Sequence, residues 1–267
     1  MELTTFCEKI YLPEEAKEIV ASILLTEGEY EGYLTLYKED ARLFWDCVLA
    51  QKNYRQLFLY LYCRMGCDTY ERYREREISD QIFWDTFYDL KLWCDACREE
   101  YGEYGIDQYD WFFRHIDLTV FRLGRLEFER MDSEWELDTA YGHVKKGDEI
   151  INIHIPGGEK LSMEACLESI EQAFQFWGKE YTYICHSWLL FPKLKEILPE
   201  DSNILKFQQL FYVPQVEYRE REGEWRIFGK VRRVLPLYPE KTNLQRSAKK
   251  YLLQGNVLGN GIGILKK

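Results

Sequence analysis

The stretch INIHIPGGEKLSMEAC, residues 151–166, decides how the second half of the chain folds. Apolar and polar side chains alternate over residues 151–155, which is the two-residue period of a strand with one buried face. A Pro-Gly-Gly turn at 156–158 ends the alternation, and Ser162 stands where a helix N-cap is expected. The pattern therefore predicts a strand ending at Ile155, a turn with two glycines, and a helix beginning near Met163.

The predicted helix and its flanks continue this alternation of strands with helices. One helical face is expected to point inward, with Cys166, Ile170, Ala173, Phe174 and Trp177. Residues 181–190 predict the next strand, and short helices are expected from Pro192 and over 203–210. Further strands are expected over 126–129, 135–138, 211–218, 225–229 and 262–266, the last after a glycine-rich turn. Such a succession favours an α/β sheet layer over a sandwich.

The first half of the chain has a different periodicity. Apolar residues recur at helical spacing, as in Ala41, Phe44, Trp45 and Val48, and Ser79 can cap a further helix. We therefore predict two domains, a helical one over 1–117 and a mixed β-sheet domain flanked by helices over 118–267. The fold class is α+β or mixed α/β.

Composition and charge exclude several classes of function. The 267 residues carry a net charge of −11, which repels phosphate backbones, so no nucleic-acid partner is expected. No apolar run approaches the roughly 18 residues that span a bilayer, and the first residues do not resemble an export signal. We expect a cytoplasmic protein with no membrane partner, whose eight cysteines are reduced thiols.

Two pairs of cysteines have spacings that could suit a metal. Cys63 and Cys67 are four residues apart, Cys94 and Cys97 are three apart, and four thiolates can hold zinc. Their neighbours are Tyr, Leu, Trp and Phe, however, and cysteine is among the most buried residue types. We expect buried thiols and no metal.

The run Cys185-His186-Ser187 raises the question of a catalytic cluster. In a strand, Cys185 and Ser187 point to one face and His186 to the other, so His186 and Ser187 cannot pair as base and nucleophile. The Gly-x-Ser-x-Gly pattern of a nucleophile elbow is also absent. Glu127 and Glu129 share one face of a predicted strand, which we expect to meet solvent without a role of its own.

Four segments together resemble a known family: LGRLEFER (123–130), residues 153–166, CHSWLL (185–190) and SNILKFQQLF (202–211). They are similar to the GNAT-like C-terminal domain of bacterial acyltransferase domain-containing proteins. The first half resembles the N-acyltransferase N-terminal domain that accompanies it. The resemblance covers nearly the whole chain and implies an acyl-transfer scaffold similar to acetyl-CoA-dependent N-acetyltransferases.

In that scaffold the donor's pyrophosphate binds backbone N–H groups between a strand and the next helix, where the helix dipole favours an anion. The resemblance places Gly157, Gly158, Lys160 and Ser162 there. The usual Gln/Arg-x-x-Gly-x-Gly/Ala fingerprint is absent and Glu159 puts an acid at this turn, so an ordinary capped turn is the alternative. No tightly bound cofactor is expected. Coenzyme A or acyl-CoA would be a substrate, and an acyl carrier protein is the other candidate donor.

The resemblance also implies roles in catalysis. Amine acylation needs a base for the attacking amine and a donor for the leaving thiol, and His186 is our candidate base because an imidazole titrates near neutrality. His154 is a candidate helper, and Ser187 or Cys185 a weaker candidate for protonating the thiol. Each histidine could instead be a core residue. We predict an N-acyltransferase moving an acyl group from a thioester to a small amine, with a non-catalytic binding module on a degenerate GNAT scaffold as the alternative.

Overall fold

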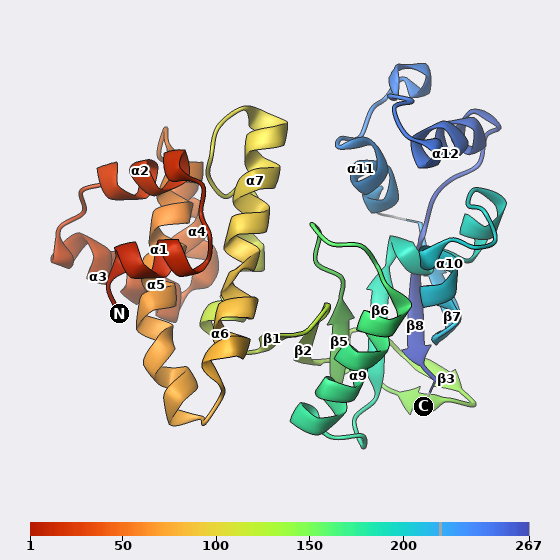
Figure 1. Ribbon diagram of the computed structural model, residues 1–267, viewed down its shortest axis with the longest axis horizontal. Coiled ribbons are helices and arrows are strands. Elements are labelled where there is room, and N and C mark those ends of the chain that lie inside the picture. The colour runs from red at the N-terminus through yellow and green to blue at the C-terminus, as the bar shows by residue number, and fades with distance from the viewer. Residues whose placement is uncertain (219–220, 267) are drawn as a thin grey trace. The chain divides into compact units, whose positions relative to one another are not determined.

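The computed structural model describes residues 1–218 and 221–266 and divides into two compact units, Met1–Leu123 and Gly124–Lys267 (Figure 1). Each unit is described by itself. We predicted a domain boundary between residues 117 and 118, and this boundary stays a prediction. The two compact units divide at Leu123 and Gly124.

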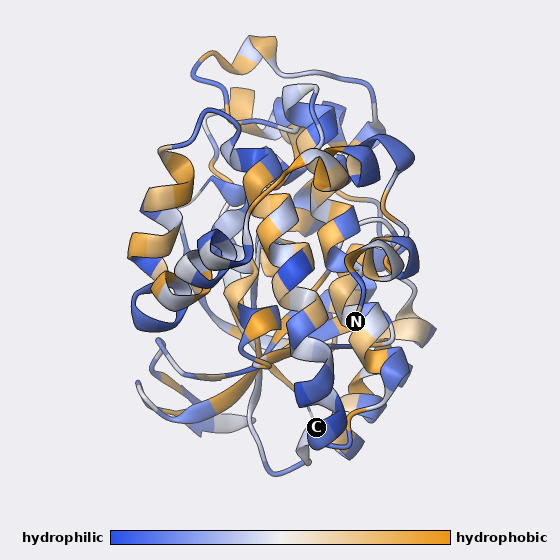
Figure 2. Cartoon of the chain, turned by 90° about the vertical axis from the view of Figure 1, so that its left-hand side faces the viewer, coloured by the Kyte–Doolittle hydropathy of each residue, from blue (hydrophilic) through white to orange (hydrophobic). Residues whose placement is uncertain are grey.

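The first unit is helical, as the periodicity predicts. Its elements are α1 (Leu3–Lys9), α2 (Glu14–Ser22), α3 (Glu27–Glu39), α4 (Ala41–Leu49), α5 (Tyr54–Glu75), α6 (Asp80–Phe87), α7 (Asp89–Tyr101), η1 (Tyr109–Trp111), α8 (Phe113–Ile116) and β1 (Val120–Leu123). Ser79 caps α6, since its side chain accepts a hydrogen bond from Ile82 N. Orange and blue residues alternate along the helices in Figure 2, which is the amphipathic pattern of helices around a core.

Helix α5 forms the centre of this unit. It packs against α1, α2, α4, α6, α7 and α8, and its residues from Leu57 to Cys63 are all buried. A helix that is covered on several sides must be apolar around most of its circumference, which explains this continuous buried run. Within the described part of the chain, no helix combines the length and the apolar character needed to cross a membrane.

The second unit contains a β-sheet with helices on its flanks. Its elements are β2 (Leu126–Asp132), β3 (Leu137–Thr139), β4 (Gly142–Val144), β5 (Glu149–His154), α9 (Met163–Trp177), β6 (Tyr183–Ser187), η2 (Trp188–Leu190), η3 (Pro192–Glu196), α10 (Asn203–Gln208), β7 (Phe211–Glu217), α11 (Glu222–Phe228), η4 (Leu235–Leu237), α12 (Asn243–Leu253) and β8 (Asn260–Leu265). The strand order within this unit is β2-β5-β6-β8-β7.

The sheet is mixed. β2 and β5 are antiparallel, β5 and β6 are parallel, and β8 lies antiparallel to both β6 and β7. The parallel pair is connected through α9, as a parallel pair requires a crossover. The strand, helix and strand predicted around residues 151–190 are thus confirmed.

Each face of the sheet has its own cover. α9 packs on the face of the sheet that carries Phe128 and Tyr183. The ring centroids of Phe174 and Tyr183 lie 5.0 Å apart, and Leu126 N donates to Ser169 Oγ. The β3–β4 hairpin covers part of the opposite face. Its apolar residues join those of the sheet in one cluster: Trp135, Leu137, Val144, Ile150, Ile184, Ile262 and Ile264.

The last strand is tightly packed, as its glycines predict. All residues of β8 are buried. A Cβ on Gly261 would lie 2.3 Å from the carbonyl oxygen of Leu190, so only glycine fits this approach of two backbones. η2 therefore lies directly against β8.

Three sequence predictions were wrong in detail. Residues 225–229 are not a strand: residues 225–228 belong to α11, and the left-handed Gly229 follows the end of that helix. An acidic first turn and a glycine after the last turn are helix signals that outweigh the short apolar run. The strand expected over 181–190 ends at Ser187, whose side chain starts η2. The helix α12, which begins with a capping box at Thr242, was not predicted.

Candidate functional site

The two parallel strands part before they end. The register between β5 and β6 consists of Ile151 with Tyr183 and Asn152 with Ile184. Beyond this point β5 continues beside β2 as far as His154, and β6 continues beside β8 as far as Ser187. Beyond this point the backbone N–H and C=O groups on the facing edges of β5 and β6 do not pair with each other. Backbone groups of this kind need other hydrogen-bond partners.

His154 and His186 occupy corresponding positions at this split. Each lies two residues beyond the last paired position of its strand, Asn152 in β5 and Ile184 in β6. Since side chains two apart share a face and paired residues share it across strands, both histidines project from the same face of the sheet. The sequence placed each on a strand, and the structure places them at matching ends.

His154 is held by two buried polar side chains. Its Nε2 lies 2.8 Å from Oε2 of Glu129 and 3.3 Å from Nδ2 of Asn152. Glu129 is only 5% exposed, so it is not on the solvent face that we expected. A protonated Nε2 donates to Glu129 and cannot then accept from Nδ2 of Asn152, and in this tautomer Nδ1 is the basic nitrogen of the ring.

His186 has a looser environment. Its ring contacts Trp135 edge-on at 5.4 Å, and its Nε2 lies 3.7 Å from Oε2 of Glu217, beyond hydrogen-bonding distance. Nε2 is buried and, among the described residues, has no hydrogen-bond partner. Its side chain as a whole is 20% exposed. The imidazole is therefore positioned by packing, with one nitrogen left for another group.

Asn260 lies next to this histidine along the sheet. It pairs in register with Glu217, and its Nδ2 donates to Oε2 of Glu222 at 2.9 Å. The side chain is buried, at 2% exposure, and its Oδ1 has no partner in the described part of the chain. His186, Glu217 and Asn260 thus present three acceptor atoms along one face.

The predicted donor turn follows β5 directly. Gly157 faces open space, Gly158 has a φ of +83°, and Lys160 is exposed. Ser162 occupies the N-cap position of α9, but its side chain makes no capping hydrogen bond. The first N–H groups of this 15-residue helix are therefore not satisfied by the cap that the sequence predicts.

Arg125 holds this turn in place through two hydrogen bonds. Its Nε donates to the carbonyl oxygen of Lys160 at 3.2 Å, and its Nη2 donates to that of Glu159 at 3.0 Å. Arg125 is buried. These two bonds satisfy two carbonyl groups of the turn. This arrangement favours N–H groups of the turn that face another partner.

Ser187 and Cys185 lie apart from the histidines. Both are buried, and alternation along β6 puts them on the face opposite His186. Ser187 Oγ accepts the N–H of Leu189, so this hydroxyl caps η2. Burial raises the pKa of the Cys185 thiol. The geometry agrees with the expectation that His186 and Ser187 do not form a nucleophilic pair.

The four cysteines considered for zinc are buried in the first unit. Burial raises the pKa of Cys67, Cys94 and Cys97 to about 12 in each case. Zinc binds the thiolate, so these raised pKa values favour protonated core thiols.

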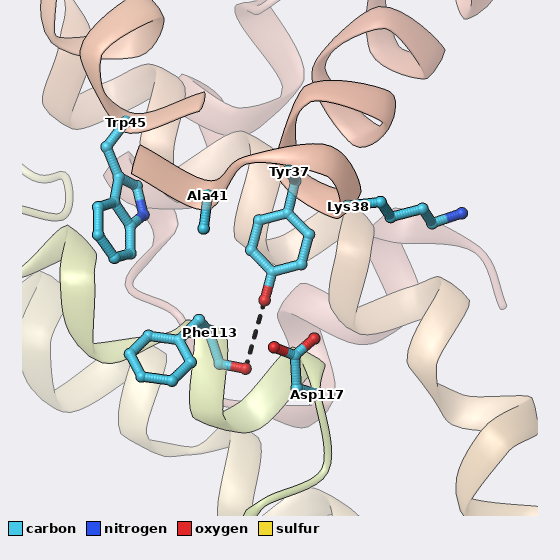
Figure 3. A pocket seen from close by; sticks show the side chains of 6 residues that line it. All are labelled: Tyr37, Lys38, Ala41, Trp45, Phe113 and Asp117. Carbon is cyan, nitrogen blue, oxygen red and sulfur yellow. Dashed lines mark hydrogen bonds between the residues drawn. The ribbon is translucent and has the colours of Figure 1, made fainter. Parts of the chain in front are cut away.

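The first unit has a cavity of about 420 Å³ at its surface. Figure 3 shows Tyr37, Ala41, Trp45 and Phe113 around it, with Tyr37 donating to the Phe113 carbonyl oxygen at 3.3 Å. Burial raises the pKa of Asp117 at its edge, although the hydrogen bond from Tyr37 opposes this. Aromatic side chains of the helical unit thus line this hollow.

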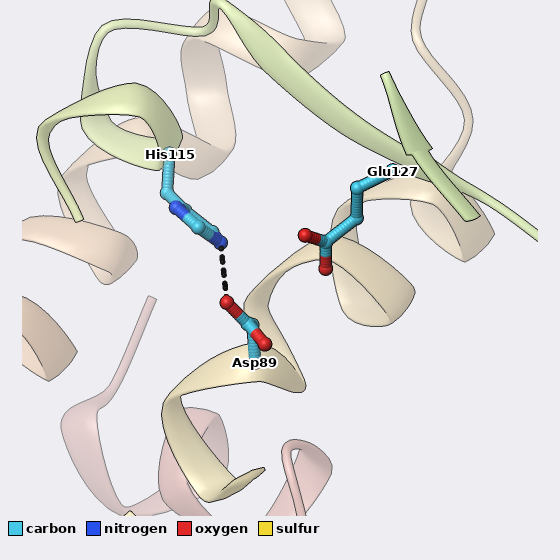
Figure 4. Close-up of side chains that lie close together, drawn as sticks. All are labelled: Asp89, His115 and Glu127. Carbon is cyan, nitrogen blue, oxygen red and sulfur yellow. Dashed lines mark ion pairs between the residues drawn. The ribbon is translucent and has the colours of Figure 1, made fainter. Parts of the chain in front are cut away.

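A second polar cluster of the first unit is structural. His115 Nε2 lies 3.5 Å from Oδ2 of buried Asp89, as Figure 4 shows, and the indoles of Trp93 and Trp111 donate to the same oxygen. The two indole N–H groups thus satisfy this carboxylate inside the core, whereas Nε2 of His115 lies near it without a hydrogen bond.

Sequence reasoning proposed the two histidines and the turn as site residues but did not consider the side chains around them. Glu129 was dismissed as a surface acid, and Glu217 and Asn260 were not considered. No local signal joined Glu129 to His154, because the β3–β4 hairpin separates their strands in the sequence. The side chains of Glu217 and Asn260 meet His186 only through the order of β6, β8 and β7, which no local pattern specifies.

Comparisons with known proteins agree with this architecture. Residues 1–118 match the N-acyltransferase N-terminal domain, and residues 120–265 match the GNAT-like C-terminal domain. A crystal structure of an acyltransferase in complex with decanoyl-CoA and teicoplanin is similar, with 19% identity, a TM-score of 0.78, and coverage of 98% of this chain and 86% of that one. A second, of an acyltransferase in complex with CoA and 10C-teicoplanin, has 20% identity, a TM-score of 0.78 and the same coverage.

At these identities the likeness to solved structures establishes the fold alone. No curated protein sequence matches the chain significantly. The match over 120–265 covers more than half of the chain, and the helical unit matches the domain that precedes it in this architecture. The chain therefore belongs to the family of GNAT-like N-acyltransferases in which an N-acyltransferase N-terminal domain precedes a GNAT-like C-terminal domain.

Proposed function

We propose that this chain transfers an acyl group from coenzyme A to an amine, at the parted ends of β5 and β6. The observation that carries the proposal is the split itself, with a glycine turn and an uncapped helix at one side and a histidine at corresponding positions of both strands. A split sheet leaves backbone groups that an amide-bearing ligand can satisfy.

The donor would lie along this split with its pyrophosphate at the start of α9. Gly157 and Gly158 allow close approach of the backbone, the N–H groups after Ser162 provide donors, and Lys160 provides a positive charge. The arm of coenzyme A between its pyrophosphate and its sulfur contains two amides, which suit the unpaired strand edges. The similar crystal structures contain decanoyl-CoA or CoA, which favours coenzyme A over an acyl carrier protein as the carrier.

The acceptor amine would attack from the face that carries His154 and His186. In the transfer the amine nitrogen bonds to the acyl carbon and the C–S bond breaks. A proton leaves the nitrogen, and the departing sulfur gains one. We assign the base to His186, because its Nε2 is buried, lacks a hydrogen-bond partner and lies beside Glu217. His154 is bound to Glu129 and Asn152 and would instead orient the donor or a water molecule.

Neither Ser187 nor Cys185 faces this site, so the proposal leaves the proton for the thiol to a water molecule or to the protonated imidazole. Both groups lie on the far side of β6. Amide formation between a thioester and an amine needs no covalent enzyme intermediate, which agrees with the absence of a nucleophilic pair among Cys185, His186 and Ser187.

Thermal melting with coenzyme A, acetyl-CoA and a long-chain acyl-CoA tests the donor. A ligand at 100 times its dissociation constant stabilises the folded state by about 2.7 kcal/mol, which is a visible shift. Release of free thiol in the presence of an amine tests the reaction. Binding without thiol release from any amine would favour the non-catalytic module, for which Glu159 beside the pyrophosphate position is the supporting observation.

No shift with any of the three ligands would contradict coenzyme A as the donor. The same melts with an acylated carrier protein would then decide whether that carrier takes its place.

A further inference from the structure

Three acceptor atoms lie together on the face that carries His186. They are Nε2 of His186, the carboxylate of Glu217 and Oδ1 of Asn260. Nε2 lies 3.7 Å from Oε2 of Glu217, and Glu217 is the register partner of Asn260 across β7 and β8. Binding of the acyl-CoA donor, as proposed above, uses none of these three groups.

The orientation of the Asn260 amide is fixed by another acid. Its Nδ2 donates to Oε2 of Glu222 at 2.9 Å, so its Oδ1 is the end of the amide that does not bind Glu222. This oxygen is buried and has no hydrogen-bond partner within residues 1–218 and 221–266. A buried acceptor without a donor is costly, and ligand N–H groups would relieve that cost.

The charges in this cluster are unequal. Glu222 is balanced by Arg226, whose Nε lies 3.4 Å from its Oε1, and acts mainly as the acceptor that fixes Asn260. Among residues 1–218 and 221–266, His186 is the one ion-pair partner of Glu217, which is 36% exposed, so its charge can reach an incoming ligand. Three acceptors and a net negative charge match a primary ammonium, which has three N–H donors and one positive charge.

Trp135 adds an aromatic wall to the same place. Its ring lies edge-on to His186 at 5.4 Å and is itself mostly buried. The negative charge of Glu217 beside this apolar ring disfavours a ligand that carries a carboxylate at this place.

We propose that the acceptor is a primary amine that enters as an ammonium ion, without a carboxylate beside it, and that Glu217 and Asn260 select it. This inference rests on the proposed acyl transfer and specifies its acceptor. The bound ammonium gives one proton through His186 to solvent. The neutral amine then attacks the acyl carbon, the C–N bond forms as the C–S bond breaks, the thiol takes the second proton, and the amide keeps the third.

Two acceptors that differ in charge test this proposal: an alkylamine, which is cationic at pH 7, and the O-alkylhydroxylamine of equal length, which is neutral but still nucleophilic. Binding of each to the coenzyme A complex is measured by calorimetry, and turnover is measured by thiol release. We expect the wild type to prefer the alkylamine. Glu217→Gln should weaken alkylamine binding by about 10-fold or more, because a charge-assisted hydrogen bond is lost, and leave binding of the neutral acceptor unchanged.

Glu168→Gln is the matched control, since it removes one negative charge from an exposed position of α9 in the same unit. Equal affinity of the wild type for both acceptors would overturn the inference, as would equal losses in Glu217→Gln and Glu168→Gln. Thiol release without an ammonium preference would leave the acyltransferase function standing alone. A selective ammonium site without thiol release from any acceptor would overturn the proposed function and leave the site. A melt of each variant checks that it is folded.

Discussion

Strands β5 and β6 run side by side, yet they end in different ways. After β6, the side chain of Ser187 immediately caps η2, and η2 packs against Gly261 of β8. After β5, Ser162 stands at the cap of α9 without making the bond, and Gly157 faces open space. One strand end satisfies its own backbone, and the other leaves donors exposed. Our proposal assigns packing to the first strand end and the ligand to the second.

The two histidines reverse this contrast. His154, beside the open turn, is held by Glu129 and Asn152, whereas His186, beside the closed turn, has a buried nitrogen without a hydrogen bond. In our proposal the end of β5 binds the acyl-CoA donor and the end of β6 provides the base, so each strand has one task. Variants on each side can break or sharpen this division.

Replacement of His186 should have the largest effect. If His186 is the base, His186→Gln should reduce kcat by about 10² to 10⁴, because general-base catalysis contributes that much. Coenzyme A binding and the melting temperature should stay unchanged, since Nε2 makes no hydrogen bond among the described residues. Thiol-release kinetics and melts with coenzyme A measure these quantities.

His154→Gln and His143→Gln are the controls for this variant. His143 lies in the β3–β4 hairpin with a side chain that is 78% exposed, so its loss should change nothing. A large loss of kcat in His154→Gln, with full activity in His186→Gln, would move the base to β5 and reverse the comparison.

Alanine at one glycine of each strand end should affect stability very differently. Gly261→Ala would place a Cβ 2.3 Å from the Leu190 carbonyl oxygen, so we expect a loss of about 2–3 kcal/mol in the free energy of unfolding. Gly157→Ala meets no atom within 4 Å and should leave stability unchanged while weakening coenzyme A binding. Urea unfolding and ligand melts separate the two effects. A destabilised Gly157→Ala that binds coenzyme A normally would identify the turn as purely structural.

The sequence predicted the elements around this split because their signals are local. Alternation over 151–155, the Pro-Gly-Gly turn and the cap position of Ser162 all lie within a dozen neighbouring residues, and the structure places β5 and α9 there. The cap bond itself did not form, which a cap preference cannot foresee. Residues 225–229 show the opposite failure, since a short apolar run suits a strand and a helix equally.

The partners of the histidines were beyond local reasoning. Glu129 meets His154 because β2 pairs with β5 in one particular register, and a shift by one residue would turn Glu129 to the other face. Glu217 and Asn260 meet His186 through β8, which enters the sheet between β6 and β7 from the far end of the chain. Strand order at such separations is decided by the whole core.

Arg125 tests whether the open turn must be held in place. Its guanidinium donates to the carbonyl groups of Glu159 and Lys160, so Arg125→Gln should loosen the turn. We expect coenzyme A affinity to fall by about 10-fold, equivalent to 1.4 kcal/mol, measured by calorimetry. Arg130→Gln in β2 is the control, because Arg130 is half exposed and pairs with Glu149 at the other end of β5. Equal affinity in both variants would mean that the turn keeps its shape without Arg125.

The smallest effects should come from the two serines, and they compare the strand ends most directly. Ser187→Ala removes the hydroxyl that accepts the N–H of Leu189, so stability should fall by about 0.5–1 kcal/mol without a change in coenzyme A affinity. Ser162→Ala removes a side chain that makes no capping bond, so stability should stay constant while coenzyme A binds more weakly. Urea unfolding and calorimetry on the two variants measure both quantities. If Ser162→Ala destabilises the fold as much as Ser187→Ala does, both helices are capped in solution, and the N-terminus of α9 is not held open for a phosphate.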